Sequence, residues 1–151
     1  MVKKSLKILI ANGVNLDLLG SRETEVYGDE DLVKLEASIE KFKLDLEKLY
    51  SCSILLEFYQ TNSEAEFLTK ISDTYDGIVI NPAAWTHTSV ALADRLSAVK
   101  TPYIETHISN ISSREEFRKK SYTAPGASGV VYGMGFSSYK SALLGLVDLL
   151  D

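Results

Sequence analysis

Three polar side chains alternate along one short segment, residues 104–110. Glu105, His107 and Ser109 are each two residues apart, so in a strand all three point to the same face. A strand inside a parallel sheet is normally apolar on both faces, and a buried carboxylate and imidazole cost free energy unless they bond each other or a ligand. Because a carboxylate orients an imidazole and raises its basicity, this pair predicts a general acid or base. A buried histidine with satisfied hydrogen bonds, or an edge strand, is the structural alternative.

A second polar cluster, residues 81–89, lies between an apolar run and a helical pattern. The first amides of a helix favour anionic or hydroxylated ligands, so this position suits a binding site. Capping of the helix by a hydroxyl such as that of Ser89 is the simpler explanation for part of the cluster. Capping does not account for Asn81 and His87, which we therefore take as candidate ligand-binding residues.

Two arginines follow the strand that carries Glu105 and His107. Residues 112–118 are expected to form one short capped helix, with Arg114 and Arg118 on the same face because they are four residues apart. A solvated, salt-bridged surface is the usual meaning of such charges. An anion pocket is the alternative, given the neighbouring polar strand.

The sequence gives weak signals for a metal or a cofactor. Glu105, His107 and His87 could supply three metal ligands, but no pair of histidines stands four residues apart. Residues 133–138 resemble a dinucleotide loop only faintly, because the third glycine is missing and the segment follows the last predicted strand. No phosphate-binding loop with a lysine occurs. The residues alone therefore favour neither a metal nor a cofactor.

The segments that must position these side chains alternate between two periodicities. Residues 32–49 carry apolar side chains three and four apart, as one buried stripe of a helix requires. Further helical patterns begin at Ser63, which with Glu66 forms a predicted capping box, and cover residues 89–99 and 137–150. Short apolar runs typical of strands occupy residues 6–11, 54–59, 77–81, 103–108 and 129–132.

This alternation of strands and helices predicts an α/β domain with a parallel sheet. Five strands suit a flavodoxin-like three-layer sandwich of strand order 2-1-3-4-5, with helices on both faces of the sheet. Ligands in such sheets bind beyond the carboxyl ends of the strands, where the polar clusters fall. The connection after the first strand, about residues 15–28, is long for an α/β unit, and its apolar anchors and glycines favour a closing lid over a structural excursion.

Composition excludes several classes of protein. The chain has 151 residues, of which 45% are hydrophobic and 25% charged, so we expect one domain spanning residues 1–151. No apolar run is long enough for a membrane span or a signal peptide, and the single cysteine agrees with a reducing compartment, so a cytoplasmic location is expected. The net charge of −5 argues against nucleic-acid binding.

Five stretches of the sequence, in order along the chain, together resemble type II 3-dehydroquinate dehydratases. The resemblance covers residues 12–28 (NGVNLDLLGSRETEVYG), 60–64 (QTNSE), 81–89 (NPAAWTHTS), 104–110 (IETHISN) and 114–122 (REEFRKKSY). It implies a flavodoxin-like subunit in a homododecamer of four trimers. The implied reaction is loss of water from 3-dehydroquinate to give 3-dehydroshikimate through an enolate, without metal or cofactor.

The resemblance also implies catalytic roles. Tyr27 would be the base that removes a proton from C2, with Arg22 on the same lid and Arg114 nearby. Asn15 would hold a water against the enolate oxygen. His107, oriented by Glu105, would protonate the departing C1 hydroxyl.

Substrate-binding roles follow in the same way. Ser109 and the backbone amides of Ile108 and Ser109 would bind the carboxylate of the substrate. Its ring hydroxyls would meet Asn81, His87 and Arg118. Asp94 would reach the site of a neighbouring subunit across the trimer interface.

The chain departs from the family pattern at three places that remove no chemical group. Val14 stands where proline is common, Ala83 and Ala84 where glycine is frequent, and Asp94 precedes rather than follows its neighbouring arginine. Two other functions remain open on the residues alone. One is a non-catalytic flavodoxin-like binding module, and the other is a flavin- or nucleotide-binding protein, which the missing phosphate loop disfavours.

Overall fold

The computed structural model describes residues 3–21, 24–27 and 30–151. Its centre is a five-stranded parallel sheet of order β2-β1-β3-β4-β5, which confirms the predicted strand order. The predicted strands are confirmed to within one residue at each end. They are β1 (Ser5–Asn12), β2 (Ser53–Gln60), β3 (Gly77–Asn81), β4 (Tyr103–His107) and β5 (Gly129–Tyr132).

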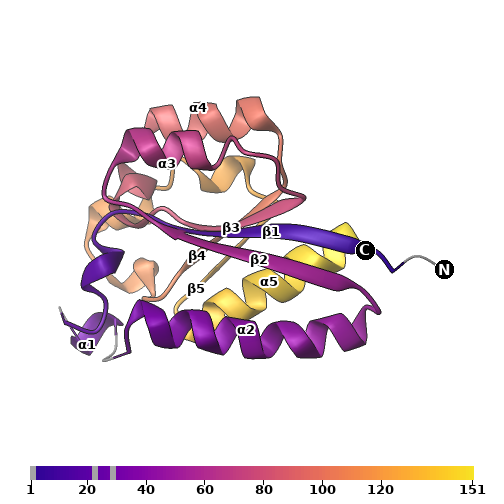
Figure 1. The fold of residues 1–151 in the computed structure, drawn as a ribbon. Coiled ribbons are helices and arrows are strands. Elements are labelled where there is room, and N and C mark those ends of the chain that lie inside the picture. Colours follow the sequence, from indigo (N-terminus) through magenta and orange to yellow (C-terminus); the bar gives the residue numbers. More distant parts are fainter. Residues whose placement is uncertain (1–2, 22–23, 28–29) are drawn as a thin grey trace.

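Helices cover both faces of the sheet, which makes the three predicted layers (Figure 1). On one face lie α2 (Leu32–Leu49) and α5 (Phe136–Leu150), and on the other lie α3 (Glu64–Lys70) and α4 (Val90–Val99). An apolar core lies on each face of the sheet. One lies between the sheet and the pair α2 and α5, and the other between the sheet and the pair α3 and α4. The strands whose carboxyl ends carry the predicted site residues are thus packed on both faces.

The apolar stripe of α2 is confirmed over most of its length. Leu35, Ile39 and Leu46 are buried against the sheet and α5. Leu49, which the periodicity also places on the stripe, is exposed. Helix α2 ends there, and Tyr50 packs against the core in its place.

Both serines that were expected to cap helices do so, but the glutamate of the predicted capping box does not take part. Ser89 caps α4 by accepting a hydrogen bond from Leu92 N, and Ser63 caps α3 by accepting one from Glu66 N. The glutamate half of the capping box is wrong. The Glu66 carboxylate accepts from the Thr61 hydroxyl instead, and that hydroxyl in turn accepts from Ser63 N.

The single short helix predicted over residues 112–118 is also wrong. The structure has two 3-10 turns, η3 (Ile111–Ser113) and η4 (Glu116–Lys119). Between them Arg114 adopts extended backbone, with φ −97° and ψ −165°. The Asn110 side chain accepts from Ser112 N and caps the start of η3, two residues before the helix was predicted to begin.

The carboxyl ends of the strands meet at one edge of the sheet, beside a group of short turns (Figure 1). These include η1 (Leu16–Leu18) after β1 and η2 (Ala83–His87) after β3, together with η3 and η4 after β4. The short helix α1 (Thr24–Tyr27) belongs to the long connection after β1. In the described part of the chain, no helix is both long and apolar enough to cross a membrane.

Candidate active site

A cavity lies at this edge of the sheet, beyond the carboxyl ends of the strands, where ligands bind in parallel sheets of this kind. Residues from four separate segments line it, after β1, after β3, at the end of β4, and around η3 and η4. Eight of the predicted site residues face the cavity: Asn15, Asn81, His87, His107, Ile108, Ser109, Arg114 and Arg118.

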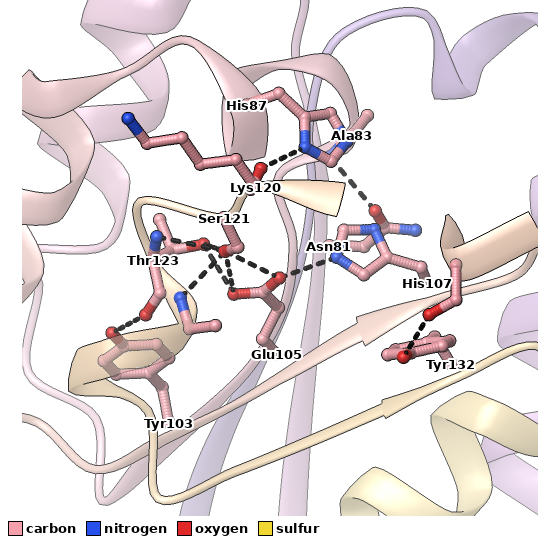
Figure 2. A network of polar contacts seen from close by, with 12 residues as sticks. Asn81, Ala83, His87, Tyr103, Glu105, His107, Lys120, Ser121, Thr123 and Tyr132 are labelled. Atoms are coloured by element: carbon pink, nitrogen blue, oxygen red, sulfur yellow. Dashed lines mark hydrogen bonds and ion pairs between the residues drawn. The ribbon is translucent and has the colours of Figure 1, made fainter. Parts of the chain in front are cut away.

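Glu105 and His107 form a buried pair at the end of β4 (Figure 2). Their side chains leave the same face of the strand, as the alternation predicted, and the distance from His107 Nε2 to Glu105 Oε1 is 2.8 Å. His107 lines the cavity, whereas Glu105 lies behind it with no exposed surface. An ionised carboxylate can only accept, so Nε2 carries the hydrogen and Nδ1 is left for a ligand.

Two hydroxyl side chains complete the environment of Glu105. Thr123 Oγ1 donates to Glu105 Oε2 at 2.6 Å, and Ser121 Oγ lies 3.1 Å from both carboxylate oxygens. The Thr123 carbonyl accepts in turn from the Tyr103 hydroxyl (Figure 2). With these donors the carboxylate needs no solvent.

The hydrogen bonds decide the ionisation of Glu105. Burial alone would raise its pKa, but the hydrogen bonds from His107, Thr123 and Ser121 and the charge of the imidazole outweigh burial, so the pKa lies below its ordinary value. Glu105 is therefore a carboxylate at neutral pH. It fixes the tautomer of His107 and stabilises the imidazolium when the ring takes up a proton.

His87 lies beside His107, with ring centroids 6.4 Å apart and planes 19° apart. Its Nδ1 donates to the Lys120 carbonyl over 2.7 Å, since a carbonyl can only accept (Figure 2). Burial is the main cause that lowers the pKa of His87. A neutral His87 leaves Nε2 as a hydrogen-bond acceptor for a ligand hydroxyl.

Two arginines give the cavity positive charge. Arg114 Nη1 lies 3.4 Å from the Ser109 hydroxyl, and Arg118 Nε is held by Glu115 at 2.7 Å. Their side chains are 14% and 20% exposed, so both guanidinium groups are partly shielded from water. Partial burial strengthens their attraction for an anion.

The loop after β1 is anchored at its start. Asn15 has left-handed backbone, with φ 67°, and its N–H donates to Asn62 Oδ1 at 2.8 Å. Gln60 Nε2 donates to Gly13 O and to Asn62 Oδ1. Residues at and just beyond the end of β2 thus hold Asn15 where it lines the cavity.

The chain matches known proteins over most of its length. A family model described as dehydroquinase class II matches residues 6–147. The chain belongs to the class II dehydroquinase family. A 3-dehydroquinate dehydratase of Geotalea daltonii is 46% identical over 93% of this chain and 94% of its own. The type II dehydroquinases of Butyrivibrio crossotus and Propionibacterium acnes, 40% and 36% identical, superpose with TM-scores of 0.85 and 0.84 over 97% and 99% of both chains.

Three residues expected from the dehydroquinase resemblance are not brought into the cavity by the described structure. Arg22 lies outside the described residues, and Tyr27 is described only as the last residue of α1, without its side chain. Asp94 is exposed on α4 and does not line the cavity of its own chain. Its predicted role, toward a neighbouring subunit, does not require it to.

Sequence reasoning missed several residues that hold the dehydroquinase site together. Ser121, Thr123, Gln60 and Asn62 contact Glu105 or the Asn15 loop across long stretches of chain. Their hydroxyl and amide types were visible, but no local spacing relates them to their partners. The metal alternative gains no support, because no three potential ligands come together among the described side chains.

Proposed function

We propose that this cavity eliminates water from 3-dehydroquinate to give 3-dehydroshikimate through an enolate intermediate. The observation that carries the proposal is the Glu105–His107 pair, in which a buried carboxylate orients an imidazole at the wall of the cavity. A hydroxyl is a poor leaving group until it is protonated, and we assign protonation of the C1 hydroxyl to His107, which lines the cavity. Class II dehydroquinase relatives named 3-dehydroquinate dehydratase support the same reaction.

The first step is removal of a proton from C2, next to the ketone. We assign this step to Tyr27, with Arg22 beside it on a lid formed by residues 15–28. A free phenol has a pKa of ~10, so a phenolate base needs cationic neighbours. Arg114 at the cavity wall contributes one such charge. Asn15, held by Asn62, positions a water that donates to the enolate oxygen.

The substrate carboxylate and hydroxyls have separate partners in this scheme. The carboxylate binds Ser109 and the amides of Ile108 and Ser109, close to the Arg114 guanidinium. The ring hydroxyls bind Asn81, His87 and Arg118, which line the cavity. His87 Nδ1 is occupied by Lys120 O, so Nε2 accepts from a hydroxyl.

We further propose that the chain acts as a single catalytic domain in a homododecamer of four trimers, in the cytoplasm, without metal or cofactor. The exposed position of Asp94 on α4 suits contact with the site of a neighbouring subunit. The same reaction serves the shikimate route to chorismate and aromatic amino acids, and also quinate breakdown. A light-scattering mass close to that of one subunit would contradict the dodecamer.

The reaction is tested by mixing the assembled protein with 3-dehydroquinate and following the absorbance of the conjugated enone product. We expect an immediate rise with the wild type. Tyr27→Phe and His107→Ala should each lower turnover at least about a hundredfold, the usual scale for acid–base groups. No rise with folded, assembled wild type would reject the proposal, and tight product binding without turnover would instead support the non-catalytic module. Near-full activity of either variant would remove that residue from the mechanism.

A further inference from the structure

The hydroxyl of Tyr139 joins two asparagines beneath the floor of the cavity. Tyr139 lies on α5 and is wholly buried. Its hydroxyl donates to Asn12 Oδ1 at 2.6 Å and accepts from Asn81 Nδ2 at 2.7 Å. Asn12 and Asn81 are register partners at the carboxyl ends of β1 and β3, and both are buried. Of these three residues only Asn81 lines the cavity.

The direction of each hydrogen bond follows from the one before it. Ala83 N–H can only donate, and it lies 3.1 Å from the Asn81 side chain, so the atom it meets is Oδ1 (Figure 2). Nδ2 therefore faces Tyr139. Burial raises the pKa of Tyr139, so its hydroxyl keeps its single hydrogen and gives it to Asn12. The result is one unbroken donor-to-acceptor chain from Ala83 to Asn12.

This chain controls the chemistry that Asn81 offers a ligand. The two ends of an amide have nearly the same shape but opposite hydrogen-bonding properties. If the Asn81 amide rotated by half a turn, Oδ1 and Nδ2 would exchange places. A ligand would then meet an acceptor in place of the donor, and a donor in place of the acceptor. Without the Tyr139 hydroxyl, the amide loses one of the two contacts that fix its orientation.

We infer that Tyr139, with Asn12 as its acceptor, is a positioning residue that sets which amide atom Asn81 turns toward the substrate. The inference rests on the proposed function, in which Asn81 binds a ring hydroxyl. Tyr139 does not touch the substrate and acts only through Asn81. A purely structural role, in which the hydroxyl merely satisfies two buried amides, is the competing explanation.

The two explanations differ in steady-state kinetics. Tyr139→Phe removes the hydroxyl and keeps the ring, so we expect KM for 3-dehydroquinate to rise about tenfold, the scale of one hydrogen bond, with kcat changed less than about threefold. Tyr75→Phe is the matched control, because Tyr75 is also nearly buried and its hydroxyl bonds Glu57, away from the cavity. Its KM should stay within about twofold of wild type. A Tyr139→Phe KM equal to that of the control would overturn the inference.

A double-mutant cycle decides whether the effect passes through Asn81. In an Asn81→Ala background no amide is left to orient, so adding Tyr139→Phe should change KM less than about twofold, although it still lowers the unfolding midpoint. The same rise in KM in both backgrounds would overturn the inference. If Tyr139→Phe does not fold, Asn12→Ala enters the same cycle, since it removes the acceptor that holds the hydroxyl in place. Failure of the wild type to turn over 3-dehydroquinate would overturn the proposed function, and this inference with it. Turnover with additive effects overturns this inference alone.

Discussion

Replacing Thr123 by valine removes one donor from a buried carboxylate while keeping the shape of the side chain. Thr123 is fully buried, and its hydroxyl lies 2.6 Å from Glu105 Oε2. A hydrogen bond to a charged group contributes about 1.5–3 kcal/mol. We expect Thr123→Val to lower the free energy of unfolding at pH 7 by about that amount. Chemical denaturation with urea measures it.

The loss should depend on pH in a defined direction. The pKa of Glu105 is lowered in the folded protein, so its ionisation contributes stability above the unfolded-state pKa, and that contribution disappears as the pH falls through the folded-state pKa. Thr123→Val moves the folded-state pKa upward. The difference between variant and wild type should therefore be largest at neutral pH and shrink in acid, toward the ~1 kcal/mol of a neutral hydrogen bond.

Thr106→Val is the matched control. Thr106 is also fully buried on β4, but its hydroxyl has no partner in the described part of the chain. Removing an unsatisfied buried hydroxyl is expected to leave stability unchanged or to raise it by ~1 kcal/mol, at every pH. A Thr123→Val loss below about 0.5 kcal/mol at pH 7, or one that does not vary with pH, would refute the reasoning about Glu105.

Two further predictions concern the loops that carry site residues. Ala83 has left-handed backbone, with φ 54°, which is strained for a residue with a Cβ atom. Ala83→Gly should therefore raise the free energy of unfolding by ~0.5–1 kcal/mol, and with it the unfolding midpoint. A lower midpoint would show that the backbone at Ala83 is not strained. Asn62→Ala removes the acceptor of Asn15 N–H, so kcat should fall about tenfold with little change in stability. Lys48→Ala on α2, far from the cavity, is the control for Asn62→Ala. If the two variants have the same kcat, the hydrogen bond from Asn15 to Asn62 does not contribute to catalysis.

Local patterns were enough to predict the sheet and the central pair of the site. The alternation of strand and helix periodicities predicted a parallel sheet with helices on both faces, and the flavodoxin-like strand order expected for five strands is confirmed. The Glu105–His107 contact was predictable because the two residues are neighbours on one face of one strand. The same local reasoning failed for residues 112–118, where the extended backbone of Arg114 separates two turns.

The supporting contacts of the site were not predictable from local spacing. Thr123 reaches Glu105 from 18 residues away, Asn62 reaches Asn15 from 47, and Tyr139 reaches Asn12 from 127. Each contact depends on how a loop or helix packs against the sheet. Such packing is set by the whole core, so a single sequence shows the residue types without their partners.

The order of the two proton transfers tests the account most directly. If the Tyr27 step forms an enolate before His107 protonates the leaving hydroxyl, then His107→Ala should block elimination but not enolate formation. The His107→Ala variant is incubated with 3-dehydroquinate that carries deuterium at C2, and the remaining substrate is analysed by mass spectrometry. We expect the substrate to lose deuterium to water faster than the variant forms product. Deuterium lost only in step with product, or not at all, would contradict the assignment of His107 to the second step.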